Sequence, residues 1–330
     1  MMMENTKKCA WLKDIFQRRE ERGLLSFEAA TLIYIVITTV IIACEWNLLD
    51  SPGSMLLARL TMVAIMTAAY GIYLYYPSKA TVLLRISFPF LGLIYWYPET
   101  YQFCSIFNYQ DHIFANIDYS IFGCQPSLEF SKIVDSTFWS ELLSMGYYSY
   151  YYMMIAMVLF YFFARYDDFQ RACFVFLASF FLFYLVFDFL PVAGPQYYYC
   201  ANGEEMGTIA NFPEMGHYFR THTDILPIDV KGIFSQWVLN VQKYGEHPTA
   251  AFPSSHVGIS MVIILLAWQA RNKWLFWILF VLFVLLSVAT VYLKAHYVID
   301  SIAGLVFGYL FFFITDRMYP YVKKWVKLKD

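Results

Sequence analysis

The chain has 330 residues and a net charge of −2; 60% of its residues are hydrophobic and only 15% are charged. Soluble domains carry about 25% charged residues, so the composition excludes that class and indicates an all-α polytopic membrane protein in a lipid bilayer. The near-neutral charge gives no sign of a nucleic-acid partner.

Residues 1–26 are polar and basic, with Trp11, Ile15 and Phe16 interleaved. This pattern predicts either an amphipathic helix on the cytoplasmic membrane surface or a solvated basic tail. The first apolar run starts only after this segment, so no cleavable signal peptide is expected.

Eight apolar segments follow, each long enough or nearly long enough to cross a bilayer. The third and sixth are short. The predicted spans are about 27–46, 55–76, 81–97, 146–164, 172–190, 254–268, 274–293 and 297–314.

The basic residues predict the orientation of these spans. With the N-terminus inside, 17 of the 23 Lys and Arg residues fall on inside segments and 6 on outside segments or their helix ends. This positive-inside bias puts both termini in the cytoplasm. The outer ends of the sixth and eighth spans then lie on the extracytoplasmic (periplasmic) or lumenal face.

Two outside connections are long, residues 98–145 and 191–253. Loops of this length usually have a task, such as capping a site. Cys104 and Cys124 fall in the first loop as a disulfide or as two free thiols, and both alternatives stay open.

A histidine and an aspartate lie four residues apart at the start of the last span. On a helix, the spacing of His296 and Asp300 puts both on one face. The carboxylate would then accept a hydrogen bond from one imidazole nitrogen, leaving the other free and more basic. A nucleophilic histidine needs this arrangement. Ionisable groups at membrane depth are costly, so they indicate function.

The motif Pro253-Ser254-Ser255-His256 opens the sixth span. Proline suits the first turn of a helix, and either serine can cap it. Free N–H groups at a helix N-terminus favour a phosphate, and His256 is placed to protonate a leaving oxygen. By itself, the motif equally fits a capped helix with an incidental histidine.

Together the two motifs resemble the type 2 phosphatidic acid phosphatase superfamily. Its second signature is P-S-G-H, matched by Pro253, Ser254 and His256, with Ser255 in the glycine place. The end of its third signature, S-R-x5-H-x3-D, matches His296 and Asp300. The resemblance covers roughly residues 82–314.

The chain departs from that superfamily in its basic residues. The S-R pair would fall at Ala289-Thr290, so its arginine is absent, and the first signature, K-x6-R-P, is missing. The segment from Ala289 to Asp300 is similar instead to the inositol phosphorylceramide synthase branch, which has a histidine–histidine–aspartate triad without that arginine.

The resemblance implies four parts: a cytoplasmic basic segment (1–26), two extra transmembrane helices (27–80), a six-helix core with the active site on its outer face (81–316) and a basic cytoplasmic tail (317–330). It also implies phosphoryl transfer from a phospholipid or lipid-phosphate substrate, without metal or cofactor. His296 attacks the phosphorus, Asp300 orients it, and His256 protonates the leaving group and then activates water or an acceptor hydroxyl.

The superfamily's cations are missing, so other residues must donate to the phosphate oxygens. We expect these donors to be Ser254, Ser255, Lys294, Arg220 and Lys243, with His247 as a further candidate. Each cation alone also fits a solvated interfacial charge. Asp188 and Tyr292 are expected behind the site, and Tyr197–Tyr199 in an interfacial belt.

Several functions remain open at this stage. The acceptor of the phosphoryl group is water in a lipid phosphatase and an alcohol in a lipid phosphotransferase. A metal-dependent hydrolase would use His256, His296 and Asp300 as ligands. A transporter with a retired site would show repeats or broken helices in matching halves, and the sequence has none.

Overall fold

The computed structural model describes residues 13–18 and 23–327, and within them it contains helices and no strand. The chain is therefore an all-α polytopic membrane protein, as predicted. Each of the eight apolar segments forms a helix: α2 (Ser26–Cys44), α3 (Pro52–Tyr75), α4 (Lys79–Cys104), α7 (Thr137–Ala164), α8 (Tyr166–Phe189), α12 (Ser255–Gln269), α13 (Lys273–Tyr292) and α14 (Val298–Lys327).

Seven of these helices, in the described part of the chain, are long and apolar enough to cross a membrane. The exception is α12, whose 15 residues span only about 22 Å. The third span, predicted to be short at 81–97, forms the 26-residue helix α4, which continues through Pro98 to Cys104. The last span also extends beyond its predicted end at 314, because α14 continues to Lys327. Residues 317–327 of the expected cytoplasmic tail are therefore the final turns of this helix.

The predicted N-terminal amphipathic helix lies largely outside the described residues. Residues 13–16 are helical, and Asp14 pairs with Lys79 at the start of α4.

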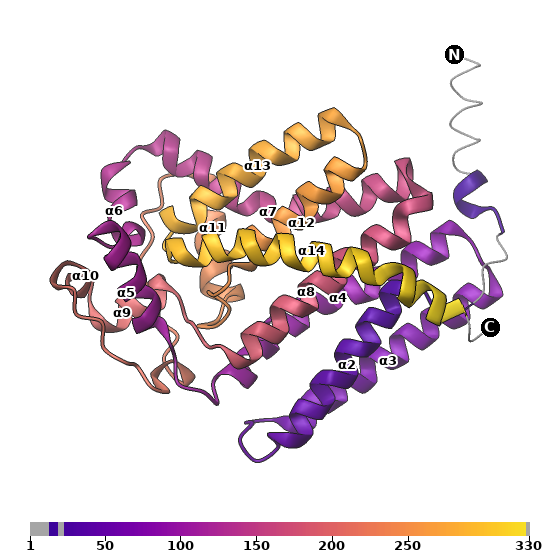
Figure 1. Ribbon diagram of the computed structural model, residues 1–330, viewed down its shortest axis with the longest axis horizontal. Coiled ribbons are helices and arrows are strands. Elements are labelled where there is room, and N and C mark those ends of the chain that lie inside the picture. Colours follow the sequence, from indigo (N-terminus) through magenta and orange to yellow (C-terminus); the bar gives the residue numbers. More distant parts are fainter. Residues whose placement is uncertain (1–12, 19–22, 328–330) are drawn as a thin grey trace.

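The two long connections fold into short helices that gather at one end of the molecule (Figure 1). They are α5 (Asp111–Phe122), α6 (Pro126–Ile133), α9 (Pro195–Asn202), α10 (Glu205–Ile209), the 3-10 turn η1 (Tyr218–Arg220) and α11 (Ile233–Gly245). Cys104 and Cys124 are both free thiols, so the disulfide alternative is wrong.

The connections before α4 and before α8 lie together at the opposite end. Lys79, the first residue of α4, lies over the ring of Tyr166, which begins α8. Arg171, in the second turn of α8, pairs with Asp316 of α14. The contact between Lys79 and Tyr166 joins two links on the same side, as alternating crossings of the membrane produce.

Helices α12 and α14 pack with almost no side chain between them. A Cβ on Gly304 would lie 2.6 Å from the Ser254 carbonyl oxygen, and one on Gly308 would lie 2.4 Å from the Gly258 carbonyl oxygen. Only glycine permits this approach, which is a common way for membrane helices to pack. The two helices that begin with the predicted motifs are thereby held side by side.

Two buried ion pairs attach the first helices to the rest of the bundle. Arg59 of α3 makes two hydrogen bonds to Glu99 of α4, at 2.7 and 2.9 Å. Arg85 of α4 pairs with Glu28 of α2. The charge count placed both arginines at segment ends near water, but both are buried, because each is neutralised by a carboxylate of a neighbouring helix.

Candidate active site

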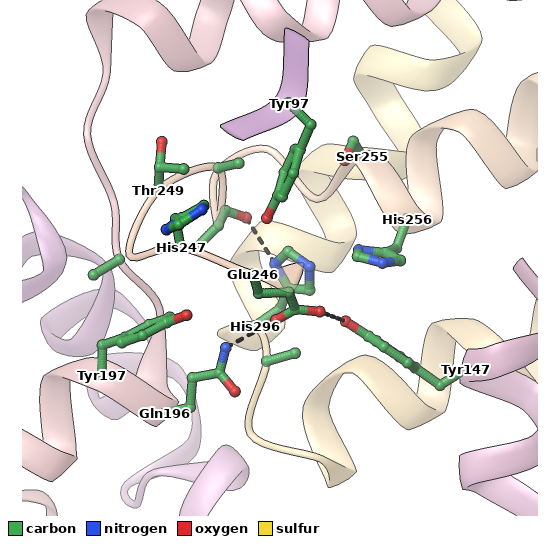
Figure 2. A pocket seen from close by; sticks show the side chains of 14 residues that line it. Tyr97, Tyr147, Gln196, Tyr197, Glu246, His247, Thr249, Ser255, His256 and His296 are labelled. Carbon is green, nitrogen blue, oxygen red and sulfur yellow. Dashed lines mark hydrogen bonds between the residues drawn. The ribbon is translucent and has the colours of Figure 1, made fainter. Parts of the chain in front are cut away.

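Two histidines from different helix ends face each other across a small cavity (Figure 2). His296 lies in the turn between α13 and α14, and His256 lies in the first turn of α12. Their ring centres are 5.7 Å apart, with the rings inclined at 67°. His296 is buried, with 4% of its surface exposed. The structure therefore brings the two predicted histidines together.

A backbone carbonyl sets the orientation of His296. Its Nδ1 lies 2.8 Å from the Ala251 carbonyl oxygen. A carbonyl oxygen only accepts, so Nδ1 carries the proton and Nε2 keeps a free lone pair. This is the tautomer that a nucleophile attacking through Nε2 requires.

The expected hydrogen bond from His296 to Asp300 is absent. The Asp300 Oδ2 atom lies 3.8 Å from Nδ1, beyond hydrogen-bond distance, and accepts instead from the Tyr297 backbone N–H at 2.9 Å. The prediction was wrong on this point because α14 begins only at Val298, so His296 precedes the helix. Asp300 is still buried near the imidazole and can stabilise positive charge on it.

Thr290 occupies the place of the missing arginine and organises the turn that holds His296. Its carbonyl oxygen accepts the backbone N–H groups of Ala295, at 3.0 Å, and His296, at 3.1 Å. Its hydroxyl lies 2.8 Å from that of Ser301 on α14. A small polar side chain therefore binds this turn to α14.

The N-terminus of α12 is recessed between longer helices. Tyr147 stacks on His256 at 4.7 Å, yet it lies ten residues, or about 15 Å, into α7. The Ser254 hydroxyl caps α12 by accepting from the Val257 N–H, and the Ser254 N–H donates to the Asp300 carbonyl. Ser255 lines the cavity.

Three carboxylates from the short helices and α7 fix the elements that carry the site. Asp118 of α5 accepts from the N–H groups of Val298 and Ile299 at the start of α14, at 2.8 and 3.1 Å. In the same way Asp111 binds the N–H groups before α9, and Glu141 binds those of α11. A carboxylate at a helix N-terminus satisfies free N–H groups and complements the helix dipole.

Burial controls the protonation of two groups around the site. It lowers the pKa of His296 to about 4, although the hydrogen bond to Ala251 and the charge of Glu246 oppose this shift. His296 is thus neutral at physiological pH, as a nucleophile must be. Burial likewise raises the pKa of Asp111 to about 7, against the lowering by its two backbone donors.

A family model described as the PAP2 superfamily matches residues 118–314, which is more than half of the chain. The chain belongs to the PAP2 superfamily. Members of this superfamily are typically phosphatases, so membership indicates phosphatase-type activity in a membrane. The matched residues include both histidine motifs, whereas α2, α3 and α4 lie before them. No curated protein and no solved structure matches the chain.

The cations expected to bind phosphate lie away from the cavity of this PAP2 protein. Lys294 approaches Glu204 at 3.4 Å, Arg220 pairs with Asp50, and Lys243 is exposed in the last turn of α11. Among the described residues, those lining the cavity include no lysine or arginine. The lining does include His247, which stacks on Tyr101 at 5.3 Å.

Several lining residues were missed by the sequence interpretation. Glu246, directly after α11, accepts hydrogen bonds from Tyr147 and Gln196 (Figure 2). Tyr197 also lines the cavity and is buried, as are Tyr198 and Tyr199, so their assignment to an interfacial belt was wrong. They lie on α9 and belong to a buried cluster with apolar residues of α5, α6 and η1. Only the fold reveals this, since no spacing links Glu246 to the histidine motifs.

The residues expected behind the site occupy different positions. Asp188 is buried near the end of α8, and its two oxygen atoms have no hydrogen-bond partner among the described residues. The Tyr292 hydroxyl donates to the Val134 carbonyl, away from the cavity. The described residues contain no group of three His, Cys, Asp or Glu side chains arranged to hold a metal ion, so His256, His296 and Asp300 do not form the ligand set of the metal alternative.

Proposed function

We propose that this protein is an integral-membrane lipid phosphatase that works through a phosphohistidine on His296. The observation that carries the proposal is the geometry of the two histidines: His296 presents Nε2 to a buried cavity that His256 shares. Its substrates are lipid phosphate monoesters or related phospholipids.

In the first step, Nε2 of His296 attacks the phosphorus, and the bond from phosphorus to the lipid oxygen breaks. His256 gives its proton to that leaving oxygen. The new imidazolium keeps its Nδ1–H bonded to the Ala251 carbonyl, while Asp300 and Glu246 supply nearby negative charge.

In the second step, His256 removes a proton from the acceptor hydroxyl, whose oxygen attacks phosphorus and releases His296. Donors to the phosphate oxygens are the Ser255 hydroxyl and the N–H groups of Ser255 and His256 in the first turn of α12. First-turn N–H groups have no acceptor within the helix, and the dipole favours an anion there.

The second candidate is a lipid phosphotransferase of the inositol phosphorylceramide synthase type. The enclosure of the site favours it: the cavity has a volume of about 20 Å³, which is room for about one water molecule, and His296 is almost completely buried. A site that excludes water protects the phosphohistidine until an alcohol arrives. Thr290 in place of arginine is also the pattern of that branch.

The proposed arrangement puts both termini in the cytoplasm and the cavity on the extracytoplasmic or lumenal side, as the positive-inside bias favours. Residues 81–316 then form the catalytic core and residues 27–80 an addition to it. Labelling of single cysteines introduced at Asp224 and Lys273 with a membrane-impermeant reagent tests this. Labelling of the first alone in intact cells supports the orientation, and labelling of the second alone reverses it.

Trapping the phospho-enzyme tests the chemistry. Purified protein in proteoliposomes is mixed with phospholipids labelled at phosphorus and quenched in alkali, where phosphohistidine survives. We expect label on the wild type and on the matched control His217→Asn, whose histidine is exposed. We expect none on His296→Asn, and loss of turnover in His256→Ala. Undiminished turnover in His296→Asn would contradict the proposal.

The products separate the two candidate functions. Release of a water-soluble labelled phosphate product without added alcohol supports the phosphatase. Transfer of the label to a hydroxyl-bearing lipid, with slow release in its absence, supports the phosphotransferase.

A further inference from the structure

The cavity beside His296 carries a negative charge where phosphoryl-transfer sites generally place cations. Glu246 lines the same cavity as both histidines (Figure 2). Its Oε1 accepts from the Tyr147 hydroxyl at 2.7 Å, and its Oε2 accepts from the Gln196 amide at 3.0 Å. Each carboxylate oxygen of Glu246 therefore has one hydrogen-bond donor within the cavity wall.

No positive side chain offsets this charge within the described lining. Of the fourteen residues that line the cavity, Glu246 is the one Asp, Glu, Lys or Arg. Lys294, Arg220 and Lys243, which would have reversed the sign of the site, are engaged or exposed elsewhere. A phosphate monoester carries nearly two negative charges at pH 7 and is therefore less favoured in such a site than a singly charged phosphodiester.

The rest of the lining suits an organic cation. Tyr97 of α4, Tyr147 of α7 and Tyr197 of α9 reach into the cavity from three sides around Glu246 (Figure 2). Aromatic rings beside a carboxylate attract an ammonium group through its charge, and both Glu246 oxygens retain lone pairs for ammonium N–H donors.

We propose that Glu246 and these tyrosines bind the amine of a zwitterionic phospholipid, so that the phosphoryl donor is a lipid phosphodiester with an ethanolamine or choline head group. This inference rests on the proposed phosphohistidine chemistry of His296. A phosphodiester carries one negative charge and the amine one positive charge, so the head group is neutral overall. The cavity, which has room for about one water molecule, widens to admit the head group, so that the amine lies against Glu246 and the phosphate at the N-terminus of α12.

The transfer step follows with its atoms balanced. Nε2 of His296 bonds to phosphorus, the bond to the diacylglycerol oxygen breaks, and His256 protonates that oxygen. The amino-alcohol phosphate then resides on His296. Attack by an acceptor hydroxyl, which loses its proton to His256, breaks the phosphorus–nitrogen bond. The products are diacylglycerol and the amino-alcohol phosphate ester of the acceptor, or the free phosphate ester when water is the acceptor.

The experiment compares four donors in proteoliposomes of the full chain: phosphatidylethanolamine, phosphatidylcholine, phosphatidylinositol and phosphatidic acid, with the same acyl chains and a phosphorus label. We expect wild-type kcat/KM to be at least about tenfold higher for an amine-bearing donor than for the other two. Preference for ethanolamine assigns the main contact to the carboxylate, and preference for choline assigns it to the rings.

Two variants make the comparison specific. Glu246→Gln removes the charge and keeps a hydrogen-bonding amide, so we expect the ratio of kcat/KM on the amine-bearing donor to that on phosphatidic acid to fall about tenfold or more, mainly through KM. Glu214→Gln, with a carboxylate 76% exposed outside the cavity lining, should leave this ratio unchanged.

Different outcomes overturn the two proposals separately. Two results would refute the amine site while leaving the His296 chemistry intact. One is a higher kcat/KM on phosphatidic acid or phosphatidylinositol than on the amine-bearing donors. The other is an equal loss of kcat/KM on all four donors in Glu246→Gln. Turnover of any donor that survives in His296→Asn refutes the proposed function itself.

Discussion

Replacing Asp118 with alanine should impair both stability and turnover, although Asp118 does not line the cavity. Its buried carboxylate accepts the first two N–H groups of α14, and α14 follows His296 directly and carries Asp300. Loss of an N-cap costs about 1–2 kcal/mol, and a hydrogen bond to a charged group contributes about 1.5–3 kcal/mol. With two such bonds removed, we expect Asp118→Ala to lower the free energy of unfolding by about 3 kcal/mol.

The start of α14 should also shift, which displaces His296 from the line of attack. A displacement of 1 Å can cost about 100-fold in rate, so we expect kcat to fall at least about tenfold. Denaturant titration in mixed micelles measures stability, and label release from the best donor measures kcat. Asp118→Asn keeps one acceptor oxygen and should recover about half of the stability. Asp224→Ala, on an exposed loop residue, is the matched control. A stability loss below about 0.5 kcal/mol in Asp118→Ala would refute the capping role.

Three further predictions concern charge, proton binding and helix packing. Arg59→Met should lower the free energy of unfolding by about 3–5 kcal/mol, because it leaves the carboxylate of Glu99 buried without its ion-pair partner. The double variant Arg59→Met/Glu99→Leu should recover most of this loss. An equal loss in the single and the double variant would contradict the ion-pair explanation. Burial holds the pKa of His296 at about 4, so His296 stays neutral as the pH falls below 6.5. We therefore expect kcat/KM to decline on the acid side only as the pH approaches 4. A decline of kcat/KM centred near pH 6.5 would contradict this prediction. Gly308→Ala puts a Cβ against the α12 backbone, so it should lower the free energy of unfolding, measured by denaturant titration, by about 1–3 kcal/mol and reduce turnover. The control Gly71→Ala adds a methyl group where there is open space and should leave the stability unchanged or raise it.

The proposed amine site would explain how a PAP2 fold can work without the superfamily's arginine and lysine. Thr290 replaces a cation by a turn-forming residue, and Glu246 adds a negative charge to the cavity. Both changes lower the attraction for a doubly charged phosphate. A substrate that brings its own positive charge makes the missing cations unnecessary.

The sequence predicted the helices well because their cause is local. A run of about 20 apolar residues must form a helix in a bilayer, where each backbone N–H and C=O needs a partner within the segment. It also predicted that His256 and His296 lie together, since both follow from the ends of neighbouring spans. The interaction of His296 with Asp300 was predicted from helical spacing and failed, because the helix begins two residues later than that spacing assumes.

The sequence by itself determined the fold class, the positions of the eight apolar helices, though not all of their ends, and the two histidine motifs. Only the tertiary structure decided what surrounds them. Asp118 comes from a short helix far away in the chain, and Ala251 and Glu246 come from the loop before His256. Their contacts depend on how these segments fold over the bundle. A hydrogen bond from a carbonyl to His296, or a carboxylate in the cavity, leaves no periodic pattern in a sequence, because it depends on three-dimensional proximity alone.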